Sequence, residues 1–349
     1  MRQRGLFKAK AALLFISRPL GTSPSRPAAS AARAAMAGVP VSTTVIGHEQ
    51  VEVAHDVSCE LGEGALWHEE LGCYLHVDIY GPSKLCAGPA VFLQNPYDAA
   101  APVRVLPMPS FCGTVVPRAS GGLVVALKDG VHAVDLASGA TTFLLNPDGV
   151  KTNRWNEGKC SPDGRLFAGT MGEPGKVEPN VGALYCVHAD LTAAKVVPDV
   201  TISNGLAWDV ARKVMYFIDT VKECVFAFDY DAASGAATNQ RVAFRIPPGT
   251  GHPDGCCIDS EGNLWVAQWG GSRVCAYNPA DGSIIAEVQL PCENVSSCTF
   301  GGPGLKDLYI TTAKEHLSAE QRKQQPLAGN CFLVRDIGWT GVPAGVFRG

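Results

Sequence analysis

The chain has 349 residues, of which 46% are hydrophobic and 18% charged, and its formal net charge is −4 at pH 7. This composition supports a large buried core, in one large domain or two ordinary ones. The first 48 residues hold seven Lys or Arg and no Asp or Glu, so the remainder carries a net charge of −11. A body this acidic argues against nucleic acid and anionic membrane surfaces as partners.

Residues 1–40 are predicted to form a disordered N-terminal extension, which leaves 41–349 for the fold. The extension is rich in Arg, Ala and Ser, as organellar transit peptides are, and its apolar stretch AALLFI is too short for a secretory signal. The alternative is an upstream start, with Met36 as the working initiator. No apolar run approaches the roughly 18 residues of a transmembrane helix. We expect a cytoplasmic protein, or a mitochondrial or plastid one if residues 1–40 are a transit peptide.

Thirteen cysteines are scattered along the chain without a C-x-x-C pair. A zinc ribbon or a disulfide framework would need regular spacing, so this pattern favours reduced and mostly buried thiols.

The segment from residue 41 onward is organised as an internal repeat. A strand-like stretch that starts with Leu or Met recurs six times at intervals of 43 to 49 residues, anchored on Leu75, Leu123, Leu166, Met215, Leu264 and Leu308. Turn signals precede four copies, and a further strand follows three. Six copies at this period predict an all-β fold, a six-bladed β-propeller with four-stranded antiparallel blades around a central metal-binding channel. Helical periodicity is clear only near residues 317–325.

Polar residues recur at a fixed distance before the anchors. Ten to twelve residues upstream of four anchors stand Glu63, Asn156, Asn204 and Asp254, and the matching positions in blades two and six are Gly113 and Cys298. Equivalent positions of the innermost strands converge at one end of a propeller. Two carboxylates and two amides there would repel and lose hydration unless a cation lay among them. The sequence predicts one divalent ion, Ca²⁺, Mg²⁺ or Mn²⁺ by the oxygen ligands, with Zn²⁺ also open.

Each of these residues alone is also a common turn former. Pro253-Asp254-Gly255 in particular predicts a β-turn, because Pro fixes φ and Gly tolerates positive φ. Four oxygen-bearing side chains at one register favour the metal site over four unrelated turns.

Seven motifs carry a family resemblance across nearly all of residues 55–349. They are GEGALW (62–67), NRWNEGK (153–159), FAGTMG (167–172), GALY (182–185), ISNGLAW (202–208), PDGCCIDSEGNLWVA (253–267) and SSCTFGG (296–302). With them the chain resembles the regucalcin (senescence marker protein), gluconolactonase and luciferin-regenerating enzyme family. The resemblance implies a six-bladed propeller that binds one divalent metal ion, in a family of which several members hydrolyse sugar lactones.

The resemblance also implies roles for individual residues. It places the metal ion on Glu63, Asn204 and Asp254, and it makes Asp254 the general base, although a metal-bound water is an equally fair nucleophile. It assigns Arg154, Asn156 and Glu173 to the substrate. The chain departs from the family pattern in having Glu157 where Asp is usual, in lacking the Ser-Pro or Gly-Pro that commonly follows the metal-binding Glu, and in having Pro174 after Glu173.

The resulting prediction is metal-dependent hydrolysis of sugar lactones to aldonic acids by a monomer or homodimer. Two other functions remain open at this point. One is a non-catalytic, calcium-binding regulatory propeller, which would not need Arg154 and Asn156. The other is organophosphate or arylester hydrolysis, for which related propellers usually use two calcium ions, whereas this sequence shows ligands for one.

Overall fold

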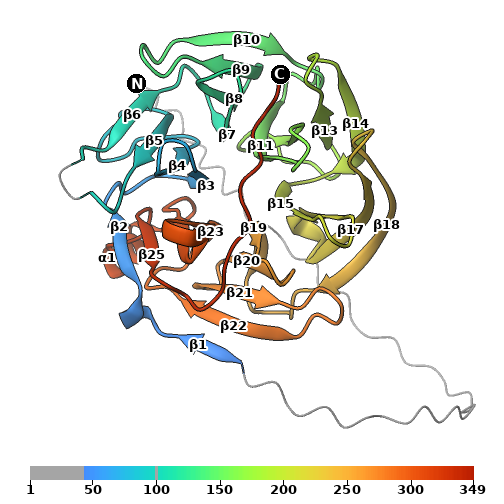
Figure 1. Cartoon of the computed structure of the whole chain (residues 1–349). Coiled ribbons are helices and arrows are strands. Elements are labelled where there is room, and N and C mark those ends of the chain that lie inside the picture. The colour runs from blue at the N-terminus through green and yellow to red at the C-terminus, as the bar shows by residue number, and fades with distance from the viewer. Residues whose placement is uncertain (1–42, 99–100) are drawn as a thin grey trace, which may run out of the picture. The chain divides into compact units, whose positions relative to one another are not determined.

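The computed structural model describes residues 43–98 and 101–349, and these form a six-bladed β-propeller (Figure 1). The predicted six blades of four antiparallel strands are confirmed. The predicted extension, residues 1–40, lies outside the described residues, and its role as a transit peptide stays a prediction. The helical stretch near residue 320 is α1 (Ala319–Gln324), and 3₁₀ helices occur at η1 (His48–Gln50), η2 (Thr220–Lys222) and η3 (Pro303–Leu305).

Each blade is a meander that runs outward from the axis of the ring. The innermost strands are β3 (Gly62–His68), β7 (Cys112–Pro117), β11 (Asn153–Cys160), β15 (Ser203–Asp209), β19 (His252–Ile258) and β23 (Val295–Gly301). The second strands are β4 (Cys73–Asp78), β8 (Leu123–Leu127), β12 (Leu166–Gly172), β16 (Val214–Asp219), β20 (Leu264–Trp269) and β24 (Asp307–Thr312).

The third strands are also mostly buried, whereas the fourth, outermost strands are more exposed. The third strands are β5 (Ala90–Gln94), β9 (Gly130–Val134), β13 (Gly182–Val187), β17 (Cys224–Asp231), β21 (Arg273–Tyr277) and β25 (Cys331–Val334). The fourth strands are β6 (Arg104–Pro107), β10 (Thr141–Leu145), β14 (Ala193–Val200), β18 (Ala236–Arg245), β22 (Ile284–Gln289) and β2 (Glu52–His55). Inner strands are buried along nearly their whole length, whereas most of β18 is exposed.

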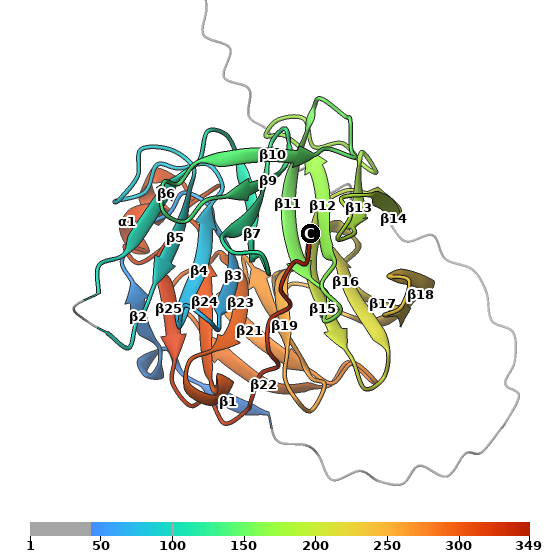
Figure 2. The same ribbon diagram turned by 45° about the horizontal axis from the view of Figure 1, so that its top comes forward.

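The two ends of the described chain close the ring together. In blade six the outermost strand is β2, which pairs antiparallel with β25 from near the C-terminus. Both views show blue β2 beside red-orange β25 (Figures 1 and 2). A further short strand, β1 (Thr44–Ile46), pairs parallel with β22 at the edge of blade five. The last blade is therefore made from both halves of the sequence.

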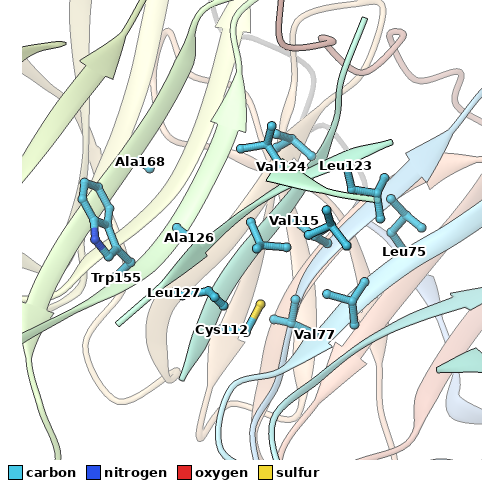
Figure 3. Close-up of a cluster of buried hydrophobic side chains, with 14 of the residues drawn as sticks. Leu75, Val77, Cys112, Val115, Leu123, Val124, Ala126, Leu127, Trp155 and Ala168 are labelled. Carbon is cyan, nitrogen blue, oxygen red and sulfur yellow. The ribbon is translucent and has the colours of Figure 1, made fainter. Parts of the chain in front are cut away.

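The hydrophobic core lies between neighbouring blades. One cluster joins Leu75 and Val77 of blade one, Val115 of blade two and Trp155 and Ala168 of blade three (Figure 3). These sheets contact a neighbour on both faces, so their strands are continuous apolar runs such as LVVAL of β8. Such packing fixes the inner strands relative to one another.

Each inner strand contains a β-bulge against the second strand of its blade. Pairing is interrupted between Glu63 and Leu66, Cys112 and Thr114, Trp155 and Gly158, Ser203 and Leu206, Pro253 and Cys256, and Val295 and Ser297. Two sequence expectations are thereby corrected. Asp254 lies in a bulged strand rather than a β-turn, and the residue of blade six at this level is Ser296 rather than Cys298. A bulge inserts unpaired residues and re-aims their side chains.

The C-terminal segment, residues 335–349, crosses the opposite end of the inner strands (Figure 1). Phe347 donates its backbone N–H to Pro117, the last residue of β7, and Ser260 donates to Thr340. A cavity of about 80 Å³ lies beneath it, and Lys159, Thr299 and Pro343 are among its lining residues. That cavity is at the far ends of the inner strands from the bulges.

Candidate functional site

The structure brings together four of the predicted polar residues from four different blades. Glu63 lies at the bulge of β3, Asn156 at that of β11, Asn204 at that of β15 and Asp254 at that of β19. All four side chains are buried, at 4–6% exposure. Their blades are far apart in the sequence, so only the propeller brings them to one level near the axis.

A chain of hydrogen bonds runs from Arg154 through Asn156 and Asn204 to the bulge of Asp254, across three blades. Arg154 donates from Nη1 to Asn156 Oδ1 (2.6 Å), and Asn156 donates from Nδ2 to Asn204 Oδ1 (3.2 Å) and to the Ser203 carbonyl (2.8 Å). Asn204 in turn donates from Nδ2 to Thr220 Oγ1 (2.7 Å). Because each amide has its nitrogen donating, the Asn204 oxygen is turned toward Asn156 and the axis.

The chain ends on the bulge that carries Asp254. Thr220 donates from Oγ1 to the carbonyl of Pro253 (2.9 Å), the residue before Asp254. Thr220 belongs to η2 in blade four, whereas Pro253 belongs to blade five. This contact ties the position of Asp254 to that of Asn204.

The carboxylates of the site are short of partners. Glu63 Oε2, Asp254 Oδ1 and Glu157 Oε1 are buried and have no hydrogen-bond partner within residues 43–98 and 101–349. Burial, and then the charges of Asp254 and Glu157, raises the pKa of Glu63 well above its usual value. Burial, and then the charge of Glu157, likewise raises the pKa of Asp254. Carboxylates in this condition need a positive charge or protons.

Such a donor set fits a divalent cation. Free oxygens on Glu63 and Asp254, with the oriented amide oxygen of Asn204, are the hard ligands that Ca²⁺, Mg²⁺ and Mn²⁺ take. A bound cation would supply the charge that the carboxylates lack. Asn156 is less available, because its oxygen accepts a short bond from the Arg154 guanidinium (2.6 Å), whereas that of Asn204 accepts only a longer bond from the Asn156 amide (3.2 Å).

The charge of Arg154 acts on both Glu63 and Asp254, and the side chain is almost fully buried, at 3% exposure. Its guanidinium lies over the ring of Tyr80, with Cζ 5.3 Å from the ring centroid. Nη1 also donates to the Trp155 carbonyl (3.0 Å), whereas Nε has no hydrogen-bond partner among the described residues. Stacking on Tyr80 and the bond to Asn156 hold the planar fork in one orientation.

The sixth predicted residue, Glu173, has other partners. It follows β12, whose last residues pair with Asn153 and Arg154, so it lies at the same end of blade three as the site. Its carboxylate forms ion pairs with Lys128 and with Lys176 (3.1 Å). Any contact with a substrate would compete with these two lysines.

Glycines at the bulges allow the inner strands to approach closely. A Cβ on Gly205 would lie 2.7 Å from the Asp254 carbonyl, and one on Gly113 would lie 2.5 Å from the Trp155 carbonyl. Both contacts are between neighbouring blades, and real Cβ atoms do not approach so near. These glycines therefore permit the spacing that lets polar side chains of adjacent blades meet.

Four contributors were not identified as site residues from the sequence. Tyr80 and Thr220 lie in connections after β4 and β16, where no motif marks them. Glu157 adjoins Asn156 in NRWNEGK, which was its sequence signal, and the structure places it in the same bulge, where its charge acts on Asp254. Glu315 also affects the pKa of Asp254, and its own pKa is raised by burial.

The fold and the site together define a class: six-bladed propellers in which carboxylates, amides and one arginine meet near the axis. Within this class, the chain matches the family described as SMP-30/Gluconolactonase/LRE-like region over residues 61–314. It belongs to that family.

Individual relatives agree with this assignment. Regucalcin of Xenopus laevis is 35% identical over 305 residues, which cover 86% of this chain and 99% of the relative. A solved structure described as a calcium-binding protein, regucalcin, from Agrobacterium tumefaciens is 25% identical with a TM-score of 0.79, covering 88% of this chain and 99% of that one. The luciferin-regenerating enzyme is 29% identical with a TM-score of 0.76, covering 85% and 99%.

Family membership supports lactone hydrolysis in general terms.

The described residues include no helix that is both long and apolar enough to cross a membrane.

Proposed function

We propose that the protein hydrolyses sugar lactones to aldonic acids in a reaction that depends on one divalent metal ion. The observation that carries the proposal is the meeting of two buried carboxylates, Glu63 and Asp254, each with one oxygen that has no hydrogen-bond partner among the described residues, with an oriented arginine, Arg154. A purely structural metal site would account for the carboxylates. It would not account for a buried guanidinium held beside them with a free Nε.

Glu63, Asn204 and Asp254 would hold the ion, and when bound it would supply positive charge that polarises the lactone carbonyl. Asp254 is the candidate general base: with one of its two carboxylate oxygens on the ion, the other could accept the proton of an attacking water. The water oxygen bonds to the carbonyl carbon, the ring C–O bond breaks, and the ring oxygen leaves as a hydroxyl group. The products are one aldonic acid and no other fragment.

Arg154 and Asn156 would position the substrate. The guanidinium presents a fixed fork that suits sugar hydroxyls and the carboxylate of the product. Asn156 links this fork to Asn204, so the substrate side and the metal side of the site are one hydrogen-bonded unit. Glu173 would add a sugar contact only if it exchanged one of its lysine partners.

The test is lactone hydrolysis followed by pH-stat with chelated protein, to which Mg²⁺, Mn²⁺, Ca²⁺ and Zn²⁺ are returned one at a time. We expect a rate above the spontaneous rate that vanishes on chelation and returns with metal. A panel of aldonolactones without any metal-dependent rate would refute the proposal. Asp209→Asn is the matched control for Asp254→Asn and should keep the metal-dependent rate. Asp209 is also a buried carboxylate, but it lies at the far end of β15 from the site.

The same experiment also tests the alternative function, a non-catalytic calcium-binding regulatory protein. The Agrobacterium relative is described as calcium-binding, and tight Ca²⁺ binding without turnover of any lactone would favour that function here. The oligomeric state, monomer or homodimer, is measured in parallel by light scattering.

A further inference from the structure

A second group of metal-ligand side chains lies where the ring closes. His55 is the last residue of β2, Cys331 is the first residue of β25, and the two are directly paired in blade six. His76 comes from β4 of blade one. One ligand atom from each of the three lies within 4.8 Å of the others. The cluster thus joins two blades and both ends of the propeller sequence.

The imidazoles of this cluster are buried without the hydrogen bonds they would need. His55 is 5% exposed and His76 is fully buried. Both ring nitrogens of His55 and Nε2 of His76 lack a hydrogen-bond partner in the part of the chain that the structure describes. A buried polar nitrogen that loses water without gaining a hydrogen bond destabilises the fold, so three such atoms at one place require an explanation.

The surroundings hold the rings in place and exclude water. His76 stacks on Phe92 with ring centroids 4.8 Å apart, and His55 meets the same ring edge-on at 5.9 Å. Nδ1 of His76 lies 3.1 Å from the Tyr309 hydroxyl. A hydrogen bond on one imidazole nitrogen that fixes the ring while the other stays free is the usual support of a histidine ligand.

The third member of the cluster supplies sulfur. Cys331 is a free and fully buried thiol. Coordination by sulfur would replace its S–H bond with an S–metal bond and release one proton to solvent.

We propose that His55, His76 and Cys331 bind one thiophilic metal ion, Cu⁺ or Zn²⁺, as a clasp between blades six and one. Imidazole and thiolate are the ligands these ions select, whereas Ca²⁺ and Mg²⁺ require oxygen. Charge favours Cu⁺: with one thiolate it makes a neutral unit in an apolar core, whereas Zn²⁺ would leave one uncompensated positive charge. This site is separate from the carboxylates near the axis and independent of the proposed hydrolysis.

The experiment measures metal uptake by the full chain, stripped of metal and reduced, with excess Mg²⁺ present to occupy oxygen ligands. Cu⁺ under anaerobic conditions and Zn²⁺ are added separately, and bound metal is counted after gel filtration. We expect one more equivalent of either ion in the wild type than in Cys331→Ser or His55→Gln. We also expect about one proton released per ion and a Tm that rises by several degrees in the wild type but not in these two variants.

Cys186→Ser is the control, because Cys186 is another buried free thiol, in β13 of blade three. It should retain the extra equivalent. If Cys331→Ser does not fold, His55→Gln carries the comparison, since its side chain keeps polar atoms at the edge of the cluster. Equal uptake of both ions by wild type and His55→Gln would overturn the proposal, as would an extra equivalent that is lost in Cys186→Ser.

Discussion

Replacing Asp254 by Asn should separate catalysis from stability. The amide has the size of the carboxylate but cannot take a proton, and Asp254 Oδ1 is a free acceptor in the wild type. General-base catalysis contributes about 10²- to 10⁴-fold to the rate, so kcat/KM should fall by that factor. This corresponds to a rise of about 3–5 kcal/mol in the activation free energy. The assay is pH-stat hydrolysis at several metal concentrations, which separates weaker metal binding from lost chemistry. More than a tenth of wild-type kcat at saturating metal would refute the role.

The same variant should stabilise the metal-free protein. Burial and neighbouring charge raise the pKa values of Asp254 and Glu63 above 3.8 and 4.5, so the folded state binds their protons more tightly than the unfolded state. Their penalty is absent at low pH and grows as the pH rises above those ordinary values. Metal-free Asp254→Asn should therefore melt above the wild type at pH 7, with the gap closing near pH 4. A variant that melts lower at pH 7 would contradict the repulsion argument.

Three further substitutions test the supporting contacts. Arg154→Lys keeps the charge but loses the fork, so kcat/KM should fall about 10- to 100-fold, mainly through KM; an unchanged KM would argue against substrate positioning. Gly205→Ala should destabilise the protein by about 1–3 kcal/mol in thermal melts because its Cβ would press on the backbone of Asp254, whereas Gly88→Ala, with open space around it, should not. Ser296→Ala should cost about 1 kcal/mol, since its hydroxyl donates to a β3 carbonyl at the bulge, and wild-type stability would show that this bond is not needed.

The fold could be predicted because each blade repeats one hairpin with one period. Leu123, Leu166 and Leu264 are the first residues of β8, β12 and β20, so they mark the same place in three blades. Counting back from such an anchor crosses a short connection and reaches the inner strand. That is why the offset found residues that the structure places together.

The bulges could not be read from the same pattern. Pro253-Asp254-Gly255 has the chemistry of a turn, and only pairing with β20 shows that it is an interrupted strand. In blade six, Leu308 is the second residue of β24, and the bulge residue Ser296 lies twelve residues before it. A count of ten therefore stops two residues short of the bulge, at Cys298.

The cluster at the ring closure had no sequence signal at all. His55 and His76 lie far from Cys331 in the chain, at no spacing that metal motifs share. Their meeting depends on β2 pairing with β25 and on blade one packing against blade six. Such contacts are a property of the closed ring.

Pairing of β2 with β25 also has a consequence for synthesis. Blades two to five are each continuous in sequence and can form as they leave the ribosome, but His55 must wait for Cys331, more than 270 residues later. Until translation is nearly complete, β2 is an unprotected strand edge, which is a site for wrong pairing. A nascent or prematurely terminated chain that stops before residue 331 would be an open ring, and its exposed edges would make it a substrate for chaperones and proteases.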